Sequence, residues 1–206
     1  MSGILLLLLG CIIAYLIGSI PTAYWLGKWG KGIDIRKQGS GNVGATNALR
    51  VLGKSSGLLV LLVDVGKGVL AVRGIPKILL NSNPIEEPWV GALLGLCVIM
   101  GHIWTLFLKF QGGKGVATSL GVFLSFDPLI TGISLLVWSI VLLLTRYVSI
   151  SSIIAALTLP SLMALWARPF AWTLVSGISC LLICYRHRPN IQRLLLGNEK
   201  KIGQSK

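Results

Sequence analysis

Long apolar segments alternate with short polar stretches along almost the whole chain. About 20 helical residues are needed to cross a bilayer core that is about 30 Å thick, so apolar runs of this kind predict transmembrane helices. We therefore expect an all-α integral membrane fold with about seven transmembrane helices, one of them a short or partial span. The predicted spans are residues 4–26, 57–72, 89–108, 116–126, 129–144, 151–166 and 170–185.

Three of these spans depart from a plain apolar helix. Pro21 lies inside the first span and predicts a kink or a break near its basic end. Asp64 and Lys67 interrupt the second span, and at a spacing of three they share one helix face and can pair. Charges at that depth usually mark a cavity or a functional interior, and the alternative is a structural ion pair that locks two helices. The span 116–126 is short and predicts a half-span that lines a cavity or begins deep in the membrane.

The charge distribution orients the predicted helices. Nineteen Lys and Arg residues against six Asp and Glu residues give a formal charge of +13, in a chain of 206 residues that is 54% hydrophobic. Because cytoplasmic loops are enriched in Lys and Arg, we expect the N-terminus outside, the C-terminus cytoplasmic and an outer loop at residues 73–88. The first span has no basic segment before it and stays apolar beyond residue 20, so we interpret it as a retained helix and not as a signal peptide.

Composition also excludes several classes of protein. The basic charge is accounted for by membrane topology and headgroup contact, and aromatic and basic residues do not interleave as nucleic-acid binding requires. The four cysteines lie within or at the end of apolar runs and form no Cys-x-x-Cys pair, so we expect no disulfide framework, no metal and no cofactor. Without an internal repeat or a long linker, residues 1–206 predict a single polytopic membrane domain.

The most informative polar stretch is residues 34–50. Its glycines allow close backbone approach, and Arg36 and Arg50 can each hold a phosphate or a carboxylate through two hydrogen bonds. Residues 45–52 favour a helix whose first amides would face an anion. The alternative is a cytoplasmic loop that is flexible through glycine and basic through topology. The glycines are Gly39, Gly41 and Gly44, and the neutral polar residues are Ser40, Asn42, Thr46 and Asn47.

A second anion signal precedes the short fourth span. Gly112, Gly113 and Gly115 surround Lys114. Flexible backbone amides, an ammonium group and the start of a helix could therefore bind one anion together. The stretch lacks the eight-residue frame and the preceding strand of a Walker loop. Its alternative is a tight membrane turn with a topological lysine.

On the predicted topology both stretches lie on the cytoplasmic side, together with residues 186–190. Two anion signals at one face of an apolar bundle indicate a site for a phosphate-bearing ligand with a lipid chain beside it. From the residues alone, an enzyme and a transporter of a phosphate-bearing anion both remain open, although a transporter would more naturally show repeated halves. A non-catalytic lipid-binding scaffold would not explain Gly, Ser and Asn concentrated beside Arg and Lys.

The ordered motifs are similar to those of one known family, the bacterial membrane acyl-phosphate:glycerol-3-phosphate acyltransferases. The resemblance extends over essentially the whole chain. The motifs are Gly-Ser-Ile-Pro at 18–21, Asp-Ile-Arg-x-x-Gly-Ser-Gly-Asn-x-Gly-Ala-Thr-Asn-x-x-Arg at 34–50, Val-Asp-x-x-Lys-Gly at 63–68, Gly-His at 101–102, Phe-x-x-Phe-x-Gly-Gly-Lys-Gly-Val-Ala-Thr at 107–118, Arg-Tyr-Val-Ser at 146–149 and His-Arg-x-Asn-Ile-x-Arg-Leu-Leu-x-Gly-x-Glu at 187–199.

The resemblance implies a multi-pass protein of the bacterial cytoplasmic (inner) membrane, with the active site facing the cytoplasm. It implies transfer of a fatty acyl group from acyl phosphate to the 1-position of sn-glycerol 3-phosphate, which gives lysophosphatidic acid and phosphate for phospholipid synthesis. The implied partners are the two substrates, membrane lipid and a soluble acyl-phosphate-forming enzyme in transient contact. Where the family has proline in Gly-His-x-x-Pro-x-Phe, this chain has Thr105, which we expect to alter local helix geometry without loss of activity.

The resemblance also assigns roles to residues of this chain. We expect no covalent acyl-enzyme, because phosphate already leaves readily and a Ser40 nucleophile would need a base beside it. The acceptor hydroxyl would lose its proton to His187 or to a substrate phosphate oxygen, and the resemblance favours the phosphate. We interpret His102 either as a structural histidine satisfied by a neighbouring helix or as a residue that supports those in contact with the substrate. The expected catalytic residues are Ser40, Asn42, Arg50, Lys114 and His187, and the expected substrate-binding residues are Gly39, Gly41, Gly44, Thr46, Asn47, Gly112, Gly113, Gly115, Asn190 and Glu199.

Overall fold

The computed structural model describes residues 3–81 and 87–203, and the regular structure in these residues is entirely helical. The chain divides into two compact units, Met1–Phe126 and Asp127–Lys206. The single domain expected from the sequence stays a prediction. The α-helices are α1 (Gly3–Ser19), α2 (Thr22–Lys31), α3 (Ala45–Leu52), α4 (Lys54–Val69), α5 (Pro88–Ile103) and α6 (Val116–Phe126) in the first unit, and α7 (Pro128–Thr145), α8 (Val148–Leu165), α9 (Phe170–Arg186) and α10 (Arg188–Leu195) in the second.

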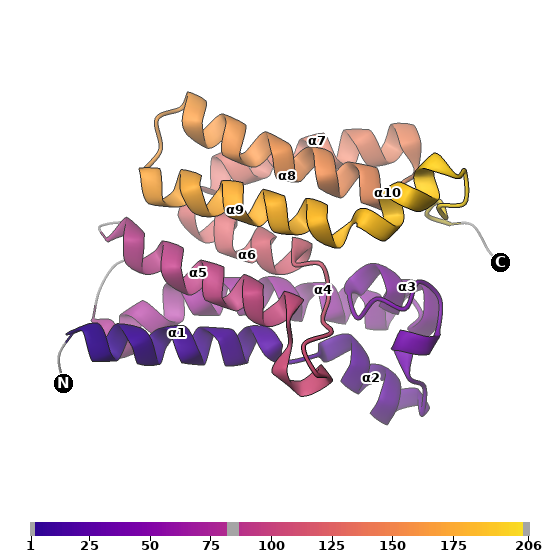
Figure 1. Ribbon diagram of the computed structural model, residues 1–206, viewed down its shortest axis with the longest axis horizontal. Helices are drawn as coiled ribbons and strands as arrows, with labels where there is room; N and C mark the ends of the chain where they lie inside the picture. Colours follow the sequence, from indigo (N-terminus) through magenta and orange to yellow (C-terminus); the bar gives the residue numbers. More distant parts are fainter. Residues whose placement is uncertain (1–2, 82–86, 204–206) are drawn as a thin grey trace. The chain divides into compact units, whose positions relative to one another are not determined.

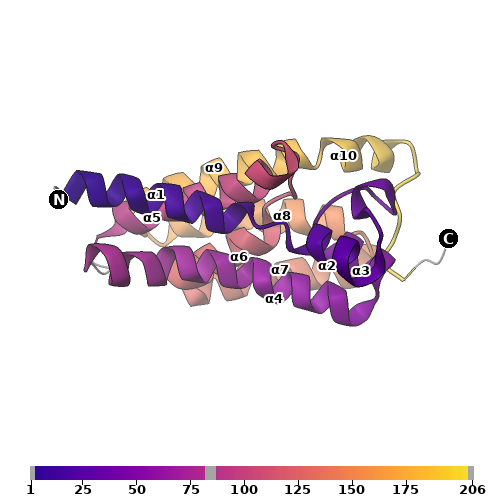
Figure 2. The same cartoon turned by 90° about the horizontal axis from the view of Figure 1, so that it is seen from below.

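In the first unit, α1 packs along α5, while α4 packs against α3 and α6 (Figures 1 and 2). Glycines allow α1 and α5 to approach closely. A Cβ atom on Gly18 would lie 2.1 Å from the carbonyl oxygen of Val98, and one on Gly101 would lie 2.1 Å from that of Tyr15. Such small-residue contacts are the usual means by which membrane helices pack. They hold the C-terminal ends of α1 and α5 together.

The predicted break at Pro21 is confirmed. Helix α1 ends at Ser19, α2 begins at Thr22, and the two axes are bent by 41°. Proline lacks the amide that would continue the α1 hydrogen-bond ladder, so the helix ends there.

The outer loop predicted to begin at residue 73 is wrong for residues 73–80. Helix α4 continues through two π-helical segments, η2 (Leu70–Gly74) and η3 (Pro76–Leu80). The Arg73 guanidinium donates a hydrogen bond to the Ser125 carbonyl at the end of α6, so its charge is satisfied inside a helix and does not force a loop. Residues 82–86 of the predicted loop lie outside the described residues.

In the second unit, α8 packs against both α7 and α9 (Figure 1). Asp127 begins α7, because its Oδ1 accepts a hydrogen bond from the Ile130 amide at 2.9 Å. Its Oδ2 pairs with Arg168 Nε at 2.6 Å, in the turn between α8 and α9. The basic tail expected after residue 185 is partly helical, because α10 follows α9 after a bend of 52°.

Three helical stretches of the described residues are long and apolar enough to cross a membrane, and the count becomes five if each of two bent pairs is one span. The bent pairs are α1 with α2 and α9 with α10. Helix α6 coincides with the short span predicted at residues 116–126 and has 11 residues. The count of seven crossings stays a prediction. The three stretches are Pro88–Leu108, Pro128–Thr145 and Val148–Leu165.

Candidate active site

The loop at residues 34–50 is built around the side chain of Asn47, which is 1% exposed. Its Oδ1 accepts a hydrogen bond from the Ser40 amide at 2.9 Å. Its Nδ2 lies 3.2, 3.1 and 3.0 Å from the carbonyl oxygens of Ile35, Gln38 and Asn42. The amide of Asn47 therefore uses its hydrogen-bonding capacity inside the loop. We infer that Asn47 shapes the loop, and its predicted contact with substrate remains untested.

Positive backbone angles let the loop turn around this amide. Gly39 and Gly41 have φ angles of +60° and +72°. Residues that carry a Cβ atom rarely adopt this region, whereas glycine adopts it readily. A Cβ atom on Gly39 would also lie 2.3 Å from Asn47 Oδ1. The glycines predicted to permit unusual dihedrals therefore do so at two of the three positions, whereas Gly44 has extended backbone and caps α3.

The polar groups expected to meet an anion lie on and beside this turn. Ser40 and Arg50 are exposed, and Asn42 and Thr46 are half-buried. Gly44 is the N-cap of α3 and no side chain caps that helix, so the start of α3 follows the turn as the sequence predicted. A helix start of this kind is suited to an anion.

Arg36 has a different neighbour from the one expected. Its Nε and Nη2 atoms donate to the two carboxylate oxygens of Asp34 at 3.0 and 2.7 Å, and its guanidinium lies 4.8 Å from the centre of the Tyr24 ring. The hydrogen bond from Arg36 lowers the pKa of Asp34 to about 2, and Asp34 raises the pKa of Arg36. Arg36 thus faces a carboxylate of its own loop.

The glycine loop at Gly112–Gly115 folds back onto the end of α5. The Gly112 amide donates to the Ile103 carbonyl and the Gly113 amide to the His102 carbonyl, both at 3.0 Å. We expected these amides to face a ligand, but close packing against α5 engages them. Lys114 is half-buried, and Gly115, with φ of +86°, leads into α6.

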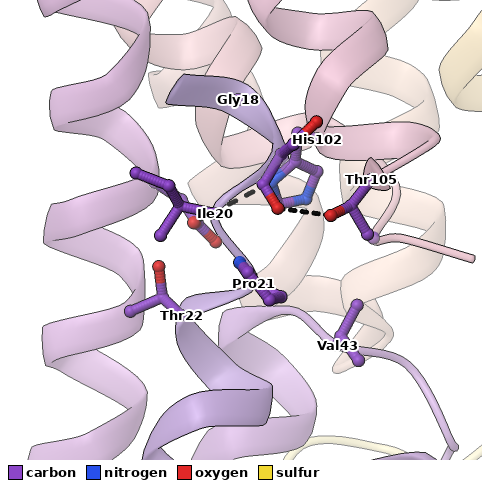
Figure 3. Close-up of a pocket in the computed structure, with 10 residues that line it drawn as sticks. Gly18, Ile20, Pro21, Thr22, Val43, His102 and Thr105 are labelled. Carbon is purple, nitrogen blue, oxygen red and sulfur yellow. Dashed lines mark hydrogen bonds and ion pairs between the residues drawn. The ribbon is translucent and has the colours of Figure 1, made fainter. Parts of the chain in front are cut away.

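The two loops lie over one buried region of the first unit. Leu108, just before the glycine loop, shares an apolar cluster with Ile35, Val43 and Ala48 of the first loop. Val43 and Gly113 also line the same small cavity, of about 10 Å³, which is enough for about one water molecule. Figure 3 shows His102 and Thr105 on one side of this cavity, with Ile20, Pro21 and Thr22 on another. The two stretches predicted to bind an anion therefore lie close together within the first unit.

His187, Asn190 and Glu199 come together in the second unit. His187 is buried between α9 and α10, with Nδ1 at 2.8 Å from the Ile183 carbonyl oxygen. Asn190 Nδ2 donates to Glu199 Oε1 at 2.5 Å. Two partners that we had not assigned also bind this carboxylate, namely Ser149 at 2.9 Å and Arg193 at 2.8 Å. Both residues lie in quoted motifs, which was the only sequence signal for them.

Burial raises the pKa of Glu199, but the hydrogen bonds from Asn190, Arg193 and Ser149 outweigh it, so the pKa lies below its usual range. The carboxylate thus ties the tail to α8 and α10. Since a carboxylate repels phosphate, this geometry favours a structural role for Glu199 over the predicted contact with substrate, which stays a prediction.

A further cluster lies beneath the glycine loop. Lys67 Nζ is 2.6 Å from Asp64 Oδ1, so the predicted pairing on one face of the second span is confirmed. His102 Nδ1 lies 3.8 Å from the same oxygen, so the neighbouring helix does contact this histidine. The sequence predicted that such a pair marks a cavity or a functional interior, and Asp64 and His102 both line the small cavity.

Comparison with known proteins gives one consistent result. The family model described as glycerol-3-phosphate acyltransferase matches residues 8–197. The chain is 48% identical to glycerol-3-phosphate acyltransferase 2 of Moorella thermoacetica, across 96% of this chain and 98% of the relative. It is 44% identical to the glycerol-3-phosphate acyltransferase of Clostridioides difficile, across 95% of each.

The fold is similar to that of PlsY (YgiH), an integral membrane glycerol 3-phosphate acyltransferase. Its crystal structure in the glycerol 3-phosphate form superposes with a TM-score of 0.87 at 40% identity, across 96% of each chain. The lysophosphatidic acid form gives 0.83 at 40% identity, across 96% of this chain and 95% of that one. The chain therefore belongs to the glycerol-3-phosphate acyltransferase family and is an integral membrane acyltransferase of phospholipid synthesis.

Proposed function

We propose that this acyltransferase moves a fatty acyl group from acyl phosphate to the 1-position of sn-glycerol 3-phosphate, giving lysophosphatidic acid and phosphate without a covalent acyl-enzyme. The observation that carries the proposal is the meeting of the Ser40–Arg50 region and the Gly112–Gly115 loop over one buried region. The relative of known structure has been seen in glycerol 3-phosphate and lysophosphatidic acid forms, which supports this acceptor and this product.

An acyl phosphate requires little chemical activation. The acceptor oxygen forms a bond to the acyl carbon, the bond from that carbon to the phosphate oxygen breaks, and phosphate leaves with the bonding electrons. The protein must align the two substrates and stabilise the developing negative charge. Alignment can contribute up to about 7–11 kcal/mol, and a preorganised donor about 3–4 kcal/mol.

We assign Ser40, Gly41, Asn42 and neighbouring amides to the donor phosphate or the carbonyl oxygen. Arg50 and Lys114 neutralise phosphate charge. The Gly112–Gly115 loop binds the phosphate of glycerol 3-phosphate in preference to that of the donor. Direct contacts of Gly39, Gly44, Thr46 and Asn190 with substrate belong to the same proposal. It places seven crossings and a cytoplasmic site in the bacterial inner membrane, with a soluble acyl-phosphate-forming enzyme as a transient partner.

The proposed route forms no acyl-enzyme. A serine nucleophile needs a general base within hydrogen-bond distance of its hydroxyl. The sequence identifies no such base beside Ser40, and an acyl phosphate needs no covalent activation by the protein. We therefore assign the proton of the acceptor hydroxyl to a phosphate oxygen of the substrate, with His187 as the alternative base.

Purified protein is given glycerol 3-phosphate with either palmitoyl phosphate or palmitoyl-CoA, and phosphate and lysophosphatidic acid are quantified. We expect both products in equal amounts from palmitoyl phosphate only. Lys114→Ala should lower kcat/KM by at least about a hundredfold, the loss expected for one oriented charge on developing phosphate charge. Lys109→Gln is the matched control, because it removes an exposed lysine from the same segment and should retain activity.

Other outcomes decide against parts of the proposal. Product from the thioester alone excludes acyl phosphate as the donor. Palmitate that stays attached to the protein after denaturation, and is lost in Ser40→Ala, reveals an acyl-enzyme. Folded protein that binds glycerol 3-phosphate but forms no product from either donor favours a transporter.

A further inference from the structure

Three ionisable side chains that the proposed reaction does not use are buried together in the first unit. Asp64 and Lys67 of α4 are 2% and 4% exposed, and His102 of α5 is 8% exposed. Lys67 Nζ lies 2.6 Å from Asp64 Oδ1, and His102 Nδ1 lies 3.8 Å from that oxygen. Charges inside a membrane bundle are costly and are retained where they have a task. The task follows from what each group touches.

Lys67 holds the break between α1 and α2. Its ammonium group donates a second hydrogen bond, of 2.6 Å, to the Ile20 carbonyl. This carbonyl lies just beyond the end of α1, where Pro21 provides no amide to continue the helix. A cation at a helix C-terminus also meets the negative end of the helix dipole. Lys67 therefore ties α4 to the point where the chain leaves α1.

His102 extends the same contacts to the glycine loop. Its carbonyl accepts the Gly113 amide at 3.0 Å. A Cβ atom on Gly113 would lie 2.1 Å from His102 Nε2, so the imidazole lies directly against the Gly113 backbone. Gly113 immediately precedes Lys114, so the imidazole contacts the residue next to the lysine that we assign to phosphate binding.

The position of the cluster indicates support and not direct contact with substrate. Asp64, His102, Ile20 and Gly113 line the cavity shown in Figure 3. The three side chains make their shortest contacts with one another, with the Ile20 carbonyl and with the Gly113 backbone. The cluster thus joins the glycine loop to the ends of α1 and α5 and to α4, and it lines the same cavity as Val43 of the first loop.

We infer that Asp64, Lys67 and His102 are positioning residues that fix Gly113 and Lys114 in the geometry that binds glycerol 3-phosphate. Lys67 holds the α1 end, Asp64 orients both Lys67 and His102, and His102 fixes the glycine loop. The inference rests on the proposed assignment of this loop to glycerol 3-phosphate. It predicts a loss of acceptor affinity that is separate from any loss of folding stability.

The main test is the double variant Asp64→Asn/Lys67→Met. It removes both charges at similar volume, so neither partner is left as an uncompensated buried charge, which is the main cost of breaking such a pair. We expect a Tm within about 3 °C of the wild type, together with a KM and a Kd for glycerol 3-phosphate raised at least about tenfold. The KM for palmitoyl phosphate should stay within about twofold. A purely structural pair would alter Tm or the active fraction but neither KM.

His102→Gln tests the second half of the network, because it leaves the Asp64–Lys67 hydrogen bond in place. It should raise the KM and the Kd for glycerol 3-phosphate in the same way, and it decides the question if the double variant does not fold. Asp127→Asn is the matched control, because it weakens a buried carboxylate–arginine pair in the other unit and should leave acceptor affinity unchanged.

Unchanged acceptor affinity in either folded variant overturns the inference. So does a fall in kcat with both KM values unchanged, because that result reports only fewer active molecules. The Kd for glycerol 3-phosphate is measured by calorimetry without donor. Wild-type protein that binds glycerol 3-phosphate but transfers no acyl group therefore contradicts the proposed function while still allowing the inference to be decided.

Discussion

At the residue scale, single buried side chains determine the shape of the site loops. Asn47 is a polar residue that the sequence suggested as a ligand-binding group, yet its amide is buried and bonded to four backbone groups of its own loop. Unsatisfied buried polar groups are costly, so a buried amide tends to be fully bonded. Asn47 consequently gives the loop one fixed conformation, and Ser40 is presented to solvent on it.

Thr105 shows how this chain accommodates its departure from the family motif. Its hydroxyl donates a hydrogen bond to the Ser19 carbonyl, which joins the end of α5 to the end of α1. Its φ of −64° and ψ of 125° suit proline as well. The backbone conformation therefore remains available to proline, and threonine adds a hydrogen bond that proline cannot make.

We expect Thr105→Pro to fold and to retain activity, with a stability change of less than about 1 kcal/mol. The lost hydrogen bond lowers the free energy of unfolding by about 1 kcal/mol. Proline raises it by about 0.4–1 kcal/mol, because it reduces the conformational entropy of the unfolded chain. Thr105→Val loses the hydrogen bond without this compensation and should unfold at a lower temperature than Thr105→Pro. Thermal unfolding in detergent measures both variants. A proline variant less stable than the valine variant would contradict this account.

At the scale of elements, short contacts between helix ends and loops arrange the chemistry. The glycine loop is anchored to the end of α5 by two backbone hydrogen bonds. The C-terminal tail is anchored to α8 and α10 through Glu199. Neither contact follows from helical periodicity, because each joins a loop to a distant helix.

Stability of the tail anchor should depend on pH through Glu199. The pKa of Glu199 is lower in the folded protein than in the unfolded chain. Its contribution is therefore fully present above the unfolded-state pKa of about 4.3, and it is lost as the pH falls through the lower folded-state value. Glu199→Gln should lower stability by about 1–3 kcal/mol at neutral pH, as expected for hydrogen bonds to a charged group.

The Tm difference between the wild type and Glu199→Gln, measured from pH 7 downwards, checks this prediction. It should stay constant to about pH 5 and then shrink as the native carboxylate is protonated. A Tm difference that grows as the pH falls would contradict this prediction. The pH dependence of the tail anchor would then come from another group.

At the scale of the whole molecule, the fold is that of an integral membrane acyltransferase made from two compact helical units. The predicted topology follows from the positive-inside bias. It puts the turn before α5 outside and the residues after α10 in the cytoplasm.

Single cysteines at Glu87 and Lys200, both exposed, test this topology in a variant whose four native cysteines are replaced by alanine. In intact bacterial cells, a membrane-impermeant maleimide should label Glu87→Cys, whereas Lys200→Cys should react only after the membrane is opened. Labelling of both positions in intact cells would exclude the predicted orientation. Permeabilised cells provide the control for total reactivity.

The sequence by itself determined the helical class, the limits of most helices, the break at Pro21 and the pairing of Asp64 with Lys67. These features depend on local pattern, because apolar run length, proline geometry and helical spacing act within about one helix. The ordered motifs also placed the chain in its family, and they singled out the two glycine-rich stretches. The helical continuation through residues 73–80 was missed, because the partner that satisfies Arg73 is on α6.

Only the tertiary structure decided which polar groups of the predicted site residues are bonded within the protein. It showed that the side chains of Asn47 and Glu199 and the backbone amides of Gly112 and Gly113 form hydrogen bonds within the protein. It also placed the Asp64–Lys67 pair and His102 under the glycine loop. The physical reason is that a hydrogen bond depends on distance and direction in space, and residues far apart in sequence meet only after the helices have packed.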